Sequence, residues 1–366
     1  MAYRKKDERL QELYDQGISP YSISKLNAMD GCYREAFYTY NKQKDRGSKN
    51  IYGVMGNSIH EALEKIYNDE ADSDCLLDAL QNDLTEAEML GIDFPRDFKG
   101  GTLIRDNWVA DMTNFCETFE KMEGDFVTEE LVILKISDTR YLIGYVDLIE
   151  IVDEDIKEIN IYDFKTSSKF KAEDLVHHGR QLVVYGMAKE QAGYKVGTLA
   201  WIMLKYVEVE YQGYKRANSK NKSTIHKIIQ RSKLPKELSP VIRNRMTEMG
   251  YNEIDTDIIL SKFEETCSMN TIPAEIRDEF SVKQYVEYYP FSEENKAEVM
   301  DYINTRADVF EKLWDSDEES DWEPVEITDK QSFYCNNLCS HRFHCPEIKK
   351  YNDLKKLNEI DEEDLF

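Results

Sequence analysis

The chain has 366 residues, seven cysteines and a net charge of -25, and 41% of its residues are hydrophobic. This length and apolar content are enough for a globular protein with one large or two ordinary domains. The negative charge argues against a generic polyanion binder, because phosphate contacts need local positive potential. No run of about 18 apolar residues occurs, and the charged N-terminus lacks the apolar segment of a secretion signal, so we expect a cytoplasmic protein.

The N-terminal third of the chain is predicted to be helical. Apolar and aromatic positions at helical spacing, behind a serine cap, predict one helix over about residues 22–40. Ser58 and Glu61 have the spacing of a capping box, so a further helix is predicted to begin there, with His60 in its first turn. Residues 75–123 have a mainly helical pattern.

The hydrophobic period changes to strict alternation near residue 129. Three consecutive strands are predicted, at 129–137, 141–152 and 159–165. A helix over about 173–192 and a buried strand at 197–210 follow. This order of strand, strand, strand, helix and strand predicts an α/β arrangement.

Charge becomes uneven after residue 210. Eight Lys or Arg and no acid lie between residues 211 and 236, whereas the last eight residues, EIDEEDLF, are acidic. The basic stretch could contact a nucleic-acid backbone or be a solvated loop. The acidic end could dock on a partner protein or serve as a solubilising tail. A strand at 282–291 and a helix at 294–314 precede a cluster of cysteines.

Charged side chains interrupt the apolar face of the 159–165 strand. Alternation places Asp163 and Lys165 on the same face, and a buried charge is costly unless it is paired or bound to metal. Together with Asp147 on the preceding strand and His60 on a helix, they could hold a divalent cation, either magnesium or manganese. Such a set suits phosphodiester hydrolysis. The alternative is a surface salt bridge between Asp163 and Lys165.

Six short segments occur in an order that resembles a known family. They are YSISKLNAMDGCYREAFY (21–38), GNSIH (56–60), GYVD (144–147), YDFKT (162–166), QLVVY (181–185) and CNNLCSHRFHC (335–345). In this order they resemble the RecB-like branch of the PD-(D/E)XK nuclease superfamily, whose members also carry an iron–sulfur cluster. The resemblance covers nearly the whole chain apart from about residues 211–280. It implies an α/β restriction-endonuclease-like core, with a central mixed sheet flanked by helices and helical additions.

The resemblance also implies roles for individual residues. The catalytic set would be Asp147, Asp163, Lys165, Gln181 and Tyr185, and the ligands of Mg or Mn would be His60, Asp147 and Asp163. Gln181 and Tyr185 match a Q-x-x-x-Y motif, although their spacing is also that of an ordinary polar pair one helical turn apart. A further acid on the preceding strand would be Glu129 or Glu130.

The cysteines form a second expected site. Three of the seven cluster near the C-terminus, which suits a metal site in a reducing compartment better than a disulfide framework. By resemblance, a [4Fe-4S] cluster would be held by Cys32, Cys335, Cys339 and Cys345. The C-x3-C-x5-C spacing departs from the family pattern, which has two residues in the first gap. The alternative is zinc, bound by the three C-terminal cysteines with His341 or His344.

These expectations divide the chain into five regions. They are an N-terminal helical region with Cys32 and His60 (1–128), the nuclease core (129–210), a basic helical insertion (211–280), a C-terminal strand, helix and cysteine cluster (281–350), and an acidic tail (351–366).

The activity implied by the resemblance is that of a metal-dependent DNA nuclease. We expect an exonuclease acting on single-stranded or end-processed DNA in recombination, repair or phage DNA metabolism, in a bacterial or phage-infected cell. No helicase motif of the G-x-x-x-x-G-K-[ST] type is present, so a partner would supply unwinding. The expected partners are DNA and a helicase, recombinase or single-strand-binding protein. The alternatives are a catalytically silent DNA-binding subunit or inhibitor, and a nuclease of RNA-directed or CRISPR-adaptation systems.

Overall fold

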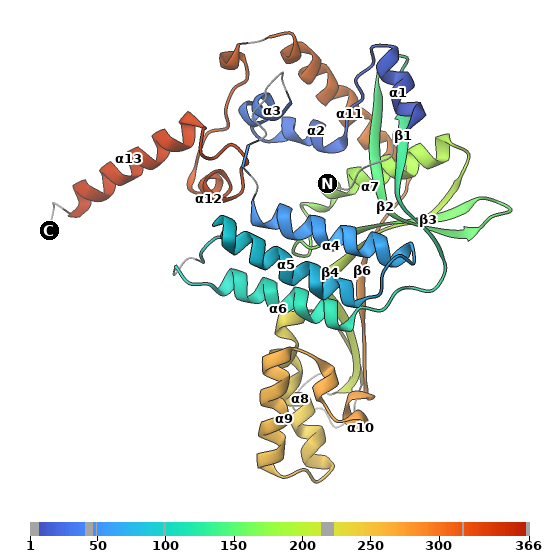
Figure 1. Cartoon of the computed structure of the whole chain (residues 1–366), viewed down its shortest axis with the longest axis vertical. Helices are drawn as coiled ribbons and strands as arrows, with labels where there is room; N and C mark the ends of the chain where they lie inside the picture. The colour runs from blue at the N-terminus through green and yellow to red at the C-terminus, as the bar shows by residue number, and fades with distance from the viewer. Residues whose placement is uncertain are drawn as a thin grey trace.

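A six-stranded mixed sheet lies at the centre of the computed structural model, which describes residues 7–40, 47–48, 50–97, 100–213, 223–316 and 318–363 (Figure 1). The strands are β1 (Asp125–Lys135), β2 (Tyr141–Asp153), β3 (Glu158–Lys165), β4 (Lys195–Gly213), β5 (Ser223–Gln230) and β6 (Phe280–Tyr289). Helices cover both faces of the sheet. The predicted α/β class, with a central mixed sheet flanked by helices, is confirmed.

The strand order explains how the chain brings distant residues together. β1, β2 and β3 form an antiparallel meander, and β3 then pairs in parallel with β4. A parallel pair needs a crossover connection, which here is helix α7 (Leu175–Gln191). The long strand β4 also pairs antiparallel with β5 and with β6.

Two separate apolar cores lie on the two faces of the sheet. On one face, Ile159 and Ile161 of β3 pack with α7 and with α11 (Glu293–Trp314). On the other face, Phe164 packs under a layer of three helices. These are α4 (Ile51–Tyr67), α5 (Asp74–Leu90) and α6 (Leu103–Thr118). Because successive strand residues alternate between faces, Asp163 and Lys165 share the face of α7.

The predicted single helix over 22–40 is wrong. The structure has α2 (Ile23–Asn27), a 3-10 turn at Ala28–Asp30 and then α3 (Tyr33–Tyr40). The break lies at Gly31, whose φ of -102° and ψ of -105° are outside the helical region. Cys32 follows the break, and its carbonyl accepts the first backbone hydrogen bond of α3 from Glu35, at 3.0 Å.

The predicted start of a helix at Ser58 is also wrong. Helix α4 begins at Ile51, and the side chain of Asn50 caps it by accepting the backbone N–H of Gly53 at 3.0 Å. Ser58 lies in the helix interior, where its hydroxyl donates to Asp83. His60 is therefore held near the middle of α4, where neighbouring turns fix the backbone on both sides.

The segment predicted as a basic helical insertion is part strand. β5 extends the sheet, and its sequence STIHKIIQ lacks a clear alternation that would have marked it as a strand among the basic residues. The helices that follow are α8 (Leu234–Glu248), α9 (Glu253–Thr266) and α10 (Ala274–Arg277), which pack around a third apolar core. Figure 1 shows them at the far end of the β4, β5 and β6 ribbon. The basic residues Lys215, Arg216, Lys220 and Lys222 lie outside the described residues, so their nucleic-acid contact stays a prediction.

The remaining helices lie at the two ends of the chain. They are α1 (Glu8–Asp15), α12 (Asp329–Asn337) and α13 (Pro346–Glu363). α13 projects away from the body, and the final residues 364–366 of the acidic tail lie outside the described part (Figure 1). None of the helices within the described residues has the length and hydropathy needed to cross a membrane.

Candidate active site

The six side chains predicted for the active site come from four elements. Asp147 lies on β2, Asp163 and Lys165 on β3, His60 on α4, and Gln181 with Tyr185 on α7. The structure brings them together as two sets of polar contacts that meet on β3.

One set connects α4 to the two strands. His60 Nδ1 lies 3.3 Å from Asp147 Oδ2. The same carboxylate oxygen accepts the backbone N–H of Phe164 at 2.9 Å. Asp147 is therefore oriented by two contacts, one from His60 on α4 and one from the backbone of β3.

The other set connects β3 to α7. The ammonium of Lys165 forms an ion pair with Asp163 and donates to Gln181 Oε1 at 3.3 Å. The amide of Gln181 in turn donates to the hydroxyl of Tyr185 at 2.8 Å. Gln181 thus contacts both the Lys165 ammonium and the Tyr185 hydroxyl.

Burial and neighbouring charges shift the pKa values of the acids in opposite directions. Asp163 is only 2% exposed, and burial, reinforced by the charge of Asp147, raises its pKa to about 6. Burial acts in the same sense on Asp147, but the hydrogen bond and charge of His60 outweigh it and hold that pKa below its usual value. Two nearby carboxylates with different pKa values are typical of a functional centre.

The basic groups of the site favour their charged forms. Burial opposes the charge of His60, yet the Asp147 carboxylate raises its pKa. Burial likewise opposes the charge of Lys165, and the attraction of Asp163 overcomes it and raises the pKa of the ammonium. Each carboxylate therefore has a cationic partner within the site.

No group of three or more His, Cys, Asp or Glu side chains within the described residues is arranged to hold a metal ion. The donor chemistry nevertheless fits magnesium or manganese, because Asp147 and Asp163 provide carboxylate oxygens and His60 an imidazole. The Oδ2 oxygen of Asp163 is buried, and its partner is the ammonium of Lys165. A cation here would compensate buried negative charge.

Gly144 of the GYVD segment has a steric role. A Cβ atom built at Gly144 would lie 2.4 Å from Cε1 of Tyr185, which is far inside normal contact. The aromatic ring of Tyr185 therefore packs directly on the backbone of β2. Only glycine allows this approach, which links the GYVD and QLVVY segments physically.

The structure distinguishes the two candidate acids on β1. Glu130 is engaged by Lys189, whose ammonium lies 2.8 Å from both carboxylate oxygens. Glu129 has a φ of 48° and lies opposite Asp147, at the position where the pairing of β1 with β2 is interrupted without a change of register. Its charge raises the pKa of Tyr185, which places Glu129 on the side of the active site.

The four cysteines predicted as cluster ligands line a single cavity of about 910 Å³. Burial and the charges of Cys32 and Cys345 raise the pKa of Cys335 to about 11. Burial also raises the pKa of Cys339, to about 12. These thiols are therefore near enough to influence one another's ionisation.

The predicted zinc ligands differ in their surroundings. His341 lines the same cavity and is 2% exposed. Its Nε2 lies 2.9 Å from the hydroxyl oxygen of Thr39. His344 does not line the cavity, so His341 is the better placed histidine for a zinc site.

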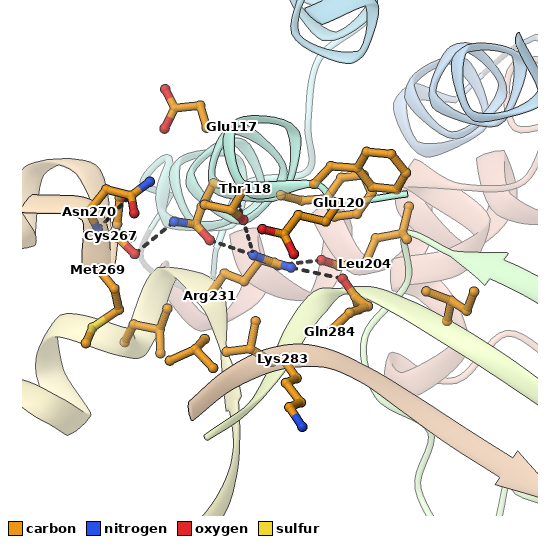
Figure 2. Close-up of a pocket in the computed structure, with 18 of the residues that line it drawn as sticks. Glu117, Thr118, Glu120, Leu204, Arg231, Cys267, Met269, Asn270, Lys283 and Gln284 are labelled. Atoms are coloured by element: carbon orange, nitrogen blue, oxygen red, sulfur yellow. Dashed lines mark hydrogen bonds between the residues drawn. The ribbon is translucent and has the colours of Figure 1, made fainter. Parts of the chain in front are cut away.

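Another buried charge, Arg231, was not found by sequence analysis. It lines a cavity of about 650 Å³ between α6, β4, β6 and the segment that follows α9, and Figure 2 shows its hydrogen bonds to neutral acceptors. The acceptors are the carbonyl of Leu204 and the side chains of Asn114, Thr118 and Gln284, at 2.8–2.9 Å. Burial lowers the pKa of Arg231 to about 10. Because the hydrogen bonds reach α6, β4 and β6, Arg231 ties the α8–α10 segment to the core.

Comparison with known proteins identifies the family of the chain. The family model of the PD-(D/E)XK nuclease superfamily matches residues 20–346, a span that contains every side chain of the candidate site and all four cysteines. A comparison with curated proteins finds no match. Nucleases of this superfamily are metal-dependent and usually use magnesium or manganese. The chain belongs to the PD-(D/E)XK nuclease superfamily.

Proposed function

We propose that this protein is a magnesium- or manganese-dependent deoxyribonuclease whose reactive centre is formed by Asp147, Asp163 and Lys165. The observation that carries the proposal is the juxtaposition of these three groups on β2 and β3, with Asp163 buried and its pKa raised to about 6. Carboxylates whose pKa is shifted by burial and a specific charged partner are found more often at functional sites than elsewhere.

Each residue has a distinct part in this centre. Bound metal would supply Lewis acidity and lower the pKa of water. Asp147 and Asp163 would hold it, with His60 as a further ligand. Lys165 would place the attacking water or stabilise negative charge on the phosphate, as its ammonium is already fixed by hydrogen bonding.

Supporting residues complete the centre. Gln181 orients Lys165, and Tyr185 anchors Gln181 through its hydroxyl. Glu129 would add negative charge near Tyr185 for metal or water. The set is complete in this chain, which disfavours the alternative of a catalytically silent DNA-binding subunit or inhibitor.

We further propose exonuclease action on single-stranded or end-processed DNA, with a helicase, recombinase or single-strand-binding protein as partner. This step rests on the resemblance to the RecB-like branch. It is consistent with the absence of a helicase motif from the sequence.

We also propose that Cys32, Cys335, Cys339 and Cys345 bind a [4Fe-4S] cluster, which would supply a structural connection between α3 and the C-terminal segment. The four thiols line one cavity, and Cys32 lies directly before the N-terminus of α3. Protein purified without oxygen should contain about four iron and four sulfide per chain. Stoichiometric zinc and no iron would favour the Cys3His site with His341 instead.

The nuclease proposal is tested with end-labelled single-stranded and duplex DNA, in magnesium and in manganese. We expect metal-dependent release of labelled products, with polarity given by which end carries the label. Lys165→Ala, purified in parallel, should retain DNA binding and lose cleavage. Wild-type protein that binds DNA yet cuts nothing in either metal would contradict the proposal and favour the DNA-binding subunit.

A further inference from the structure

The face of α7 that points toward the active site continues beyond Gln181. His178, Gln181 and Tyr185 have the spacing i, i+3 and i+7, which places them along one stripe of the helix. Burial lowers the pKa of His178, and the charges of His177 and Lys165 add to this effect, so the imidazole lies within electrostatic reach of the Lys165 ammonium. His178 therefore borders the candidate active site at its outer end.

His178 is half of a stacked aromatic pair. Its imidazole lies parallel to the ring of Phe170, with 3.9 Å between centroids and 19° between planes. Phe170 belongs to the segment that leaves β3 just after Lys165. Phe170 in turn contacts the fully buried Trp201 edge-on, at 4.9 Å and 74°. The pair is thus anchored in the core. His178 lies on α7, and Phe170 lies in the segment that connects β3 to α7.

The chemistry of the pair suits an aromatic contact better than a phosphate contact. Burial, together with the charges of His177 and Lys165, lowers the pKa of His178 to about 4. The imidazole is then neutral near pH 7 and does not attract phosphate as a cation would. Both rings are partly exposed, so the pair presents aromatic surface to solvent beside the site.

We propose that the stacked pair of His178 and Phe170 is a platform on which a nucleobase of the single-stranded substrate stacks, next to the phosphodiester that is cut. This inference rests on the proposed nuclease function and assigns a positioning role that none of the six active-site residues has. Stacking on aromatic side chains is sequence-tolerant, because every base has a π-face. An unpaired base can reach the platform, whereas a base within a duplex stays stacked on its neighbours. The platform would therefore favour single-stranded or frayed ends.

The test pairs variants with substrates that lack one base. Oligonucleotides carrying a single abasic nucleotide at successive positions from the labelled end are cut by wild type, His178→Ala, His178→Phe and His177→Ala. Wild type should lose roughly 10-fold in kcat/KM when the abasic nucleotide occupies one particular position. His178→Ala should lose a similar factor on the intact substrate and show no further penalty on the abasic one. His178→Phe keeps an aromatic face and should keep the penalty.

His177→Ala is the matched control. His177 is the adjacent histidine; its Nδ1 lies 3.7 Å from Asp30, and its ring meets that of His178 edge-on, at 5.3 Å between centroids, without taking part in the stack on Phe170. We expect this variant to behave as wild type on every substrate. If His178→Ala instead slows the intact and abasic substrates by the same factor, His178 only supports the fold and the platform is overturned.

Dissociation constants of the same oligonucleotides separate this inference from the nuclease proposal. If wild type binds but never cuts, the nuclease function fails, while the abasic penalty in Kd still decides the platform. A penalty that is present in wild type and absent in His178→Ala supports stacking. An equal penalty in both proteins, or none in wild type, rejects it.

Discussion

Two of the buried charged sites within the described residues are organised in opposite ways. At the candidate active site, Asp163 and Lys165 pair with each other, and the pKa of Asp163 is raised to about 6. At the second cavity, Arg231 has no carboxylate in hydrogen-bond contact and is held by neutral acceptors from α6, β4 and β6 (Figure 2). Both arrangements avoid an uncompensated buried charge.

The difference teaches what kind of burial marks a reactive centre. Arg231 donates hydrogen bonds through all three of its nitrogen atoms, so its geometry is complete without a ligand. Asp163 is instead held by its ion pair with Lys165, next to a second carboxylate, Asp147. We infer that the first site stabilises the fold and that the second is prepared to exchange its internal ion pair for bound metal.

The largest effect is expected from Lys165→Ala. Loss of a preorganised group that stabilises transition-state charge lowers kcat by about 10²–10³-fold. The measurement is single-turnover cleavage of labelled DNA with saturating metal. Lys189→Ala is the control, because Lys189 is also a buried lysine but pairs with Glu130. Lys189→Ala should lower the stability of the protein and leave the cleavage rate of the folded protein nearly unchanged. Equal losses of cleavage rate in both variants would contradict a specific role of Lys165.

A second, smaller loss is expected from Gly144→Ala. The added Cβ would force the ring of Tyr185 from its place and so disturb Gln181 and the Lys165 ammonium. A displacement of about 1 Å near a reactive centre can cost roughly 10²-fold in rate.

The control for this change is Gly53→Ala on α4. Its nearest neighbour, the side-chain oxygen of Asn50, would lie at an ordinary 3.7 Å from the new Cβ. The rate should be unaffected, and helix propensity should raise stability by up to about 1 kcal/mol. A Gly144→Ala enzyme with wild-type kcat would show that the position of Tyr185 does not matter for cleavage.

Proton and metal should compete at the active site. The pKa of Asp163 is raised to about 6 without metal, and that of His60 is raised as well, so both groups hold protons as pH falls. Protonated ligands do not bind metal, and cleavage at limiting metal should therefore fall about tenfold per pH unit, or more steeply, below pH 6. Saturating metal should move the midpoint to lower pH. A midpoint independent of metal concentration would contradict this competition.

The smallest effect on activity is expected from Arg231→Met. The change leaves several buried acceptors without a donor, which should lower the free energy of unfolding by about 3 kcal/mol. The cleavage rate per folded molecule should change less than about twofold, because Arg231 lies outside the active site and its loss acts on the stability of the fold. Denaturant unfolding and active-site titration separate the two quantities. A loss of rate with unchanged stability would mean that this cavity takes part in catalysis.

The sequence predicts which charged residues share a face of β3 better than it predicts which residues of α7 contact them. Period-2 alternation was sufficient to place Asp163 and Lys165 on one face of β3, because a strand has no other periodicity. The contact of Lys165 with Gln181 depends on how α7 crosses between β3 and β4. No local pattern in the sequence predicts that geometry.

Other features could not be read from local patterns. The start of α4 was misplaced because Ser58 and Glu61 imitate a capping box, whereas the functional cap is Asn50. Burial of Arg231 depends on the docking of a distant helix, α6, which no local pattern reveals. β5 was missed because it lies within a stretch rich in Lys and Arg and its exposed face mixes Thr224, His226 and Ile228.

Binding of Mn²⁺, measured by electron paramagnetic resonance at pH 7.5, tests the central claim most directly. Wild type should bind manganese, Asp163→Asn should lose that binding, and Arg231→Met should keep it. This result would show that the buried Asp163 carboxylate, and not buried charge in general, forms the metal centre. Unchanged manganese binding in Asp163→Asn would contradict the account.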